Sequence, residues 1–115
     1  MAALSVVTSS NIGSAQVGNN GFVYIQTCIT KAGKARTGLT KQEVTFDILL
    51  VGPGGYTLVW NPTPHGYWEN HPGYYLIELI PAANGTWVQG TWIIAIKFAA
   101  GNDYGQSLAS FTIPA

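Results

Sequence analysis

An alternation of side chains with a period of two, from Lys41 to Gly55, constrains the fold more than any other stretch of this chain. In this segment, KQEVTFDILLVGPGG, one face of the expected strand is fully apolar, and the opposite face becomes apolar only towards its end. A strand with this pattern starts at the wet face of a sheet and ends inside the protein. The turn from Gly52 to Gly55 then stops it. The chain returns from Tyr56 to Trp60, which predicts a central hairpin of an antiparallel sheet.

Further β-prone segments lie before and after this stretch, at intervals of roughly ten residues, and turns rich in Gly and Pro separate them. They cover Leu4 to Thr8, Phe22 to Thr30, Tyr74 to Ile80, Thr86 to Phe98 and Ser107 to Ile113. We expect their core-facing residues to be Val23, Ile25, Thr27 and Ile29; Trp92, Ile94, Ile96 and Phe98; and Ala109, Phe111 and Ile113. Gly90 marks a bulge or a bend. No helical period is found, so the pattern predicts an all-β antiparallel sandwich of seven or eight strands, with an up-and-down or jelly-roll barrel as the alternative.

A chain of 115 residues suits one domain that buries a core without disulfides or metal. Residues 1–20 are interpreted as an N-terminal arm or edge strand, because a short β-prone piece is followed by a stretch rich in Ser, Asn and Gly. Residues 21–115 then form the sandwich. The N-terminus lacks the features of a signal peptide, and no window of about eighteen apolar residues exists, so we expect no membrane partner.

Charged side chains make up only 9% of the chain, against roughly 25% in an ordinary soluble domain. A soluble protein normally covers itself with charges, so a surface of neutral polar groups indicates that much of it contacts another protein. The alternative is a protein kept soluble by those neutral groups. The basic residues between Lys31 and Lys41 lack the charge and the interleaved aromatics of a phosphate-binding stripe, so nucleic acid is not an expected partner.

Candidates for catalysis or metal binding are few. His65, Glu69 and His71 fall within seven residues, and two imidazoles with a carboxylate could ligate zinc. Their spacing matches no standard motif, so we assign no metal and no cofactor. Suitably separated carboxylates, a nucleophile elbow, a phosphate loop and a Ser/His/Asp grouping are not found either. Cys28 is the only cysteine and is interpreted as a small buried hydrophobe. The sequence therefore predicts a protein that is not an enzyme.

The segment from Asn61 to Gly73 contains three prolines and two glycines, which excludes a helix or a central strand and predicts a long loop. Aromatic residues crowd in and around it: Tyr56, Trp60, Tyr67, Trp68, Tyr74 and Tyr75. We expect Trp60 and one of Tyr74 or Tyr75 to be core residues. Tyr67 and Trp68 are expected outside the core, where rings stack on sugars or anchor a protein partner. The candidate partner- or glycan-binding residues are therefore Trp60, His65, Tyr67, Trp68 and His71.

Four phrases of the chain combine a turn with a strand. They are Lys31-Ala32-Gly33-Lys34 with Thr37-Gly38-Leu39-Thr40, then Pro72-Gly73-Tyr74-Tyr75, Gly90-Thr91-Trp92 and Phe111-Thr112-Ile113. Over Phe22 to Ile113 the chain thereby resembles bacterial and phage immunoglobulin-like modules. The Cys and Trp hallmark of antibody domains is missing, since one cysteine cannot make the inter-sheet bridge. The resemblance implies an immunoglobulin-like sandwich, and such modules serve as spacers, virion or surface decorations and adhesion units.

Two functional hypotheses follow. The preferred one is a non-catalytic structural or interaction protein of a larger assembly, such as a phage virion decoration, tail or fibre component, at the virion or cell surface; a cytoplasmic protein is the alternative location. Its partners would be copies of itself or other subunits, contacted by the loop from Asn61 to Gly73 and by the N-terminal arm, which could add a strand to a neighbour. Deleting residues 2–18 would then abolish assembly and leave a folded monomer. The alternative function is a carbohydrate-binding module that stacks glycan on Tyr67, Trp68 and one of Trp60 or Trp87.

Overall fold

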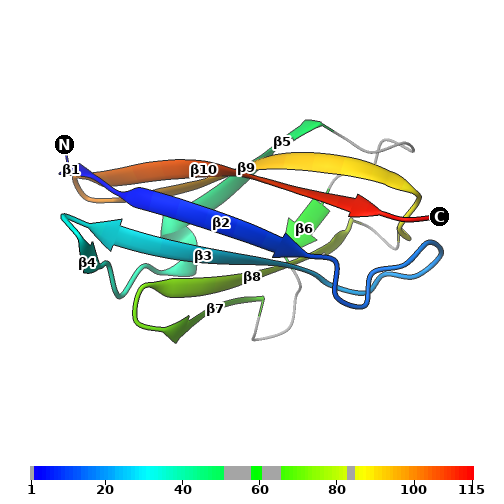
Figure 1. Cartoon of the computed structure of the whole chain (residues 1–115), viewed down its shortest axis with the longest axis horizontal. Helices are drawn as coiled ribbons and strands as arrows, with labels where there is room; N and C mark the ends of the chain where they lie inside the picture. Colours follow the sequence, from blue (N-terminus) through cyan, green and yellow to red (C-terminus); the bar gives the residue numbers. More distant parts are fainter. Residues whose placement is uncertain (1, 51–57, 61–65, 83–84) are drawn as a thin grey trace.

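The computed structural model describes residues 2–50, 58–60, 66–82 and 85–115, which form ten strands and one short 3-10 helix, Lys41–Glu43, in two facing sheets (Figure 1). The four-stranded sheet has the order β1 (Ala2–Ala3), β10 (Asp103–Ile113), β9 (Gly90–Ala100) and β5 (Val44–Leu50). The six-stranded sheet has the order β2 (Ser5–Asn11), β3 (Val23–Lys31), β8 (Tyr74–Pro81) and β6 (Leu58–Trp60), with β4 (Lys34–Ala35) on β3 and β7 (Tyr67–His71) on β8. All pairs are antiparallel except β1 with β10. The prediction of an all-β fold with antiparallel sheets is confirmed.

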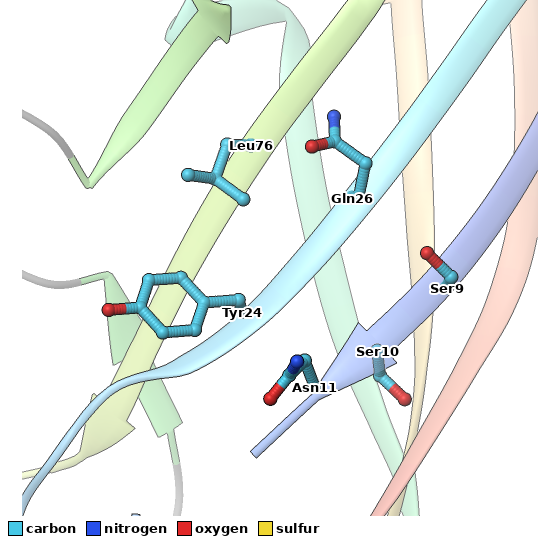
Figure 2. Close-up of a pocket in the computed structure, with 6 residues that line it drawn as sticks. All are labelled: Ser9, Ser10, Asn11, Tyr24, Gln26 and Leu76. Carbon is cyan, nitrogen blue, oxygen red and sulfur yellow. The ribbon is translucent and has the colours of Figure 1, made fainter. Parts of the chain in front are cut away.

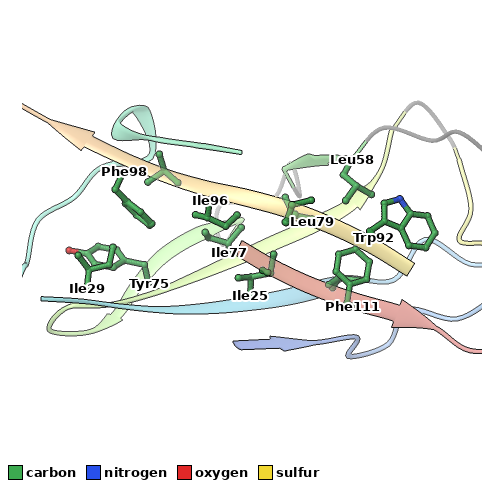
Figure 3. Packing of buried hydrophobic residues seen from close by; sticks show 14 of the residues in the cluster. Ile25, Ile29, Leu58, Tyr75, Ile77, Leu79, Trp92, Ile96, Phe98 and Phe111 are labelled. Atoms are coloured by element: carbon green, nitrogen blue, oxygen red, sulfur yellow. The ribbon is translucent and has the colours of Figure 1, made fainter. Parts of the chain in front are cut away.

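The core lies between the sheets and consists of residues that alternate along each strand (Figure 3). The residues of β3, β9 and β10 that the sequence predicts to face inward are all buried, from Val23 to Ile29, from Trp92 to Phe98 and from Ala109 to Ile113. Aromatic rings occupy both ends of the core, Tyr75 and Phe98 at one end and Trp92 and Phe111 at the other, with aliphatic side chains between them. The predicted inward faces of these three strands are therefore confirmed.

The expected hairpin from Lys41 to Trp60 is wrong. β5 pairs with β9 in one sheet, whereas β6 pairs with β8 in the other. Alternation reports which face of a strand is buried, but it does not report which strand lies beside it. The turn assigned to Gly52 to Gly55 lies outside the described residues. No helix in the described part of the chain is long and apolar enough to cross a membrane.

The N-terminal residues join the two sheets along one side. β1 pairs in parallel with the start of β10, and the Leu4 N–H donates to a β10 carbonyl oxygen at 2.8 Å. The chain then enters the other sheet as β2 but still lies along β10 (Figure 1). The Thr8 hydroxyl donates to the Leu108 carbonyl oxygen at 2.7 Å, and the Ser10 hydroxyl donates to the Ser110 carbonyl oxygen. We call this line of contact the β2–β10 seam.

The residues after β2 pack on the same chain. Ala15 is buried, and the Gly18 N–H donates to the Trp87 carbonyl oxygen at 2.9 Å. The Trp87 N–H in turn donates to the Asn19 carbonyl oxygen at 2.7 Å. In this structure the segment 2–20 is an edge strand followed by a packed loop, and it does not extend away from the body as an arm would.

A cluster of three charged residues joins the sheets at the start of β10. The Asp103 carboxylate lies 2.8 Å from Lys31 Nζ and 2.8 Å from Arg36 Nε. Hydrogen bonds from Lys31, which has the larger effect, and from Arg36 hold the pKa of Asp103 below its ordinary value of 3.8. Two of the basic residues between Lys31 and Lys41 are thereby engaged in ion pairs within the chain.

Candidate interaction surface

The expected loop from Asn61 to Gly73 is wrong from Tyr67 onwards, because Tyr67–His71 forms β7 and pairs with β8. Its prolines are compatible with this strand: Pro62 and Pro64 precede it, and Pro72 lies in the turn to β8, so none removes a hydrogen bond from the ladder. Gly73 completes the turn with a φ of 79°, a conformation that glycine adopts without strain. The count of prolines was therefore less informative than their positions.

Tyr67 packs against the core, which contradicts the expectation that it lies outside. Its ring stacks on the buried Tyr75 ring at a centroid distance of 5.8 Å, and its hydroxyl donates to the Leu39 carbonyl oxygen at 2.7 Å. Burial raises the pKa of Tyr67 above its ordinary value. Trp68 points the other way and is 50% exposed, so of the two residues Trp68 has the more exposed ring.

The other candidate residues lie in different surroundings. His71 is exposed, and its ring meets the Tyr74 ring edge to face at 6.3 Å. His65 and the side chain of Trp60 lie outside the described residues, so their roles stay predictions. Trp87, an alternative member of the stacking platform, is fully buried, and its Nε1–H donates to the Gly21 carbonyl oxygen at 2.7 Å. That burial excludes Trp87 from any surface platform.

Glu69 is engaged in holding backbone. One carboxylate oxygen accepts the Gly38 N–H and the other accepts the Gly73 N–H, each at 3.1 Å. These bonds tie β7 to the segment before the 3-10 helix and to its own turn. Within the described ranges no three His, Cys, Asp or Glu side chains are grouped as metal ligands, and His65 lies outside those ranges.

The strands β2, β3, β8 and β7 lie side by side in this order and form one outward face. The N-terminal segment and β7 therefore flank the same surface. The strand register aligns two rows of side chains across it: Val7, Cys28, Tyr74 and His71 in the first row, and Ser9, Gln26, Leu76 and Trp68 in the second. We call this surface the β2–β7 face. Cys28 is half-buried in the first row and does not belong to the core, contrary to expectation.

A shallow hollow of 330 Å³ lies on the β2–β7 face (Figure 2). Its lining residues are Ser9, Ser10, Asn11, Tyr24, Gln26 and Leu76. In Figure 2, Tyr24 and Leu76 lie on one side of the hollow and the β2 side chains on the other. The Gln26 and Asn70 side chains bond each other reciprocally, Gln26 Nε2 to Asn70 Oδ1 at 3.4 Å and Asn70 Nδ2 to Gln26 Oε1 at 3.2 Å.

The β2–β7 face carries almost no charge. Among the described residues that point outward from its four strands, Glu78 is the only acidic one and is 8% exposed, and His71 is the only basic one. The sequence pattern of β3 already separates Tyr24, Gln26 and Cys28 from the buried residues, so their outward direction could be predicted. Their neighbours on β2, β7 and β8 could not, because those contacts depend on the order of strands.

Comparison with known proteins finds no matching family model, no similar curated protein and no similar solved structure.

Proposed function

We propose that this chain is a non-catalytic structural subunit of a larger assembly, an immunoglobulin-like module of the kind found as a virion decoration, tail or fibre component. The observation that carries the proposal is the pair of exposed aliphatic side chains at the β2–β10 seam. Val7 is 64% exposed and Leu108 is 61% exposed. With charged residues at only 9% of the sequence, such side chains favour a surface that is covered by another protein.

These two residues lie on the two strands of the seam, which come from distant parts of the sequence. Thr8, which follows Val7 on β2, bonds the Leu108 carbonyl oxygen across the seam, so the two residues come from neighbouring strands. Val7 also stands in the first row of the β2–β7 face, next to Cys28 and two places from Tyr74, which is 44% exposed. Exposed apolar side chains thus lie on both sheets, Val7 and Tyr74 in one row of the β2–β7 face and Leu108 on the outward side of β10. Burying them removes apolar area from water at roughly 25 cal/mol per Å².

The order of strands supports the immunoglobulin-like assignment. Leaving out β1, β4 and β6, which have two or three residues each, the strands can be lettered A to G in chain order. One sheet then has the order A-B-E-D and the other the order C-F-G, as in constant-type immunoglobulin domains. This arrangement agrees with the family that the turn-and-strand phrases resemble.

The proposal is tested by the absolute mass in solution, measured by light scattering at two concentrations. We expect an oligomer whose mass hardly changes on dilution, and a shift towards monomer in the double variant Val7→Ser, Leu108→Ser. Val17→Ser is the matched control, since Val17 is 51% exposed but lies in the loop after β2. A monomeric wild type, or a double variant that keeps the wild-type mass, would count against assembly through the seam.

A further inference from the structure

We infer that the second row of the β2–β7 face binds a neutral saccharide, with one sugar ring stacked on Trp68 and the hydroxyl groups of the next bound by the Gln26–Asn70 amide pair. This goes beyond the proposed subunit role and uses other residues than the seam does. An assembly that leaves the second row accessible would carry an adhesion site on each copy.

The second row of the β2–β7 face is extended. Trp68, Leu76 and Gln26 are register neighbours on β7, β8 and β3, and Ser9 follows on β2. Adjacent strands lie about 4.8 Å apart, so the row extends over roughly 14 Å. An oligosaccharide can lie along such a row, with the hollow beside Gln26 receiving its far end (Figure 2).

Trp68 provides an aromatic surface at one end of the row. Half of the Trp68 surface is exposed at the β7 edge of the face, although its neighbour Tyr67 is turned into the protein. An indole offers a wide, flat apolar area with few rotatable bonds, which suits the C–H face of a pyranose ring. Tyr24 adds a second ring at the hollow and is held edge to face against Phe22 at 6.3 Å.

Gln26 and Asn70 provide a hydrogen-bonding pair. The two bonds between Gln26 and Asn70 use one donor and one acceptor of each amide. Each amide keeps a second N–H and a second lone pair, now fixed in direction by its partner. Vicinal sugar hydroxyls both donate and accept, so they complement such a pair at a reduced cost in side-chain freedom on binding.

The β2–β7 face offers little charge to a ligand. Among the described outward residues of the four strands, the one carboxylate is the buried Glu78, and no lysine or arginine is present. An anionic ligand such as a phosphate, sulfate or uronic acid would find no lysine or arginine among these residues, only the imidazole of His71 at the β7 edge. The arrangement of hydroxyl, amide and aromatic groups therefore favours a neutral sugar.

The test is calorimetric titration of the full chain with five neutral oligosaccharides (cello-, malto-, manno-, xylo- and N-acetylated chito-oligosaccharides) and with oligogalacturonate as the acidic comparison. We expect at least one neutral oligosaccharide to bind and oligogalacturonate not to bind. Trp68→Ala and Gln26→Leu should each lower the affinity by about tenfold or more, and Trp68→Phe by less. Tyr104→Ala is the matched control, because Tyr104 is an aromatic residue that is 40% exposed but lies on β10 of the other sheet.

Three results would overturn the inference: no binding by any of the neutral sugars, an affinity that Trp68→Ala leaves unchanged, or a Trp68→Ala variant that alters the mass of the assembly and not the affinity for sugar. The last result would assign the row to a protein contact. The Val7→Ser, Leu108→Ser variant separates the two proposals, since it should change the mass and leave sugar binding intact.

Discussion

At the scale of single residues, Asp103 contributes the clearest electrostatic link between the sheets. Its side chain is 10% exposed and contacts Lys31 from β3 and Arg36 from the segment after β4. Because its pKa is lower in the folded state than in the unfolded chain, the cluster stabilises the fold above the ordinary pKa of 3.8. This contribution is lost as the pH falls through the lowered pKa of the folded protein.

Asp103→Asn should therefore lower the melting temperature at about pH 7, and the difference from wild type should shrink as the pH falls through the lowered pKa of Asp103, below which the carboxyl is protonated in both states. Asp47→Asn is the control, since the Asp47–Lys97 pair is exposed on both sides, at 57% and 37%, and is screened by solvent. Thermal unfolding followed by circular dichroism across this pH range gives the answer. A deficit of the Asp103 variant that stays the same at every pH, down to the most acidic, would contradict the assigned role.

At the scale of elements, the β7–β8 turn depends on the close approach of its glycine to neighbouring backbone. A Cβ on Gly73 would lie 3.0 Å from the Ile29 carbonyl oxygen and 3.0 Å from Ala35 Cβ. Gly33 has the same φ of 79°, yet a Cβ there would have no atom within 4 Å. The two positions separate the cost of the backbone conformation from the cost of crowding.

Gly33→Ala should destabilise the protein by about 1–2 kcal/mol, the usual cost of a left-handed conformation in a residue with a side chain. Gly73→Ala should cost more than that, because Ile29 and Ala35 must move as well. Urea unfolding of both variants measures the difference. Equal losses at the two positions would show that the turn accommodates a methyl group freely.

The same elements show what the sequence could and could not predict. The alternation in β3 and β9 predicted their buried faces, because a strand of a sheet that packs against another sheet buries every second side chain. The partners of β5 and β6 were not predictable from that alternation, since each buries one face whichever strand lies beside it. At the candidate surface Trp68 was identified from its place in an aromatic stretch. Gln26 and Asn70 could not be identified as a pair from the sequence, because their hydrogen bonds join different strands.

At the scale of the whole molecule, the N-terminal segment contributes to both sheets. Leu4 and Ala15 are buried, and β2 pairs with β3 along its full length. Deleting residues 2–18 should abolish cooperative unfolding, because a small domain has only about 5–15 kcal/mol of stability to lose. Tryptophan fluorescence during urea titration measures this, and adding a peptide of residues 2–18 should restore the transition. If the segment were instead an arm that exchanges between subunits, the truncated chain would remain folded as a monomer. Cooperative unfolding of a monomeric truncated chain would therefore favour the exchanged arm.

The β2–β10 seam also determines how the molecule would carry tension. The two ends of the chain lie at opposite ends of its 42 Å long axis (Figure 1), and the segment leaving the N-terminus runs parallel to β10. Force applied at the two ends would slide these strands past each other and load their hydrogen bonds all at once in shear. An antiparallel pair pulled from one end would instead unzip bond by bond. A module with this geometry is suited to resist mechanical stretching along its length.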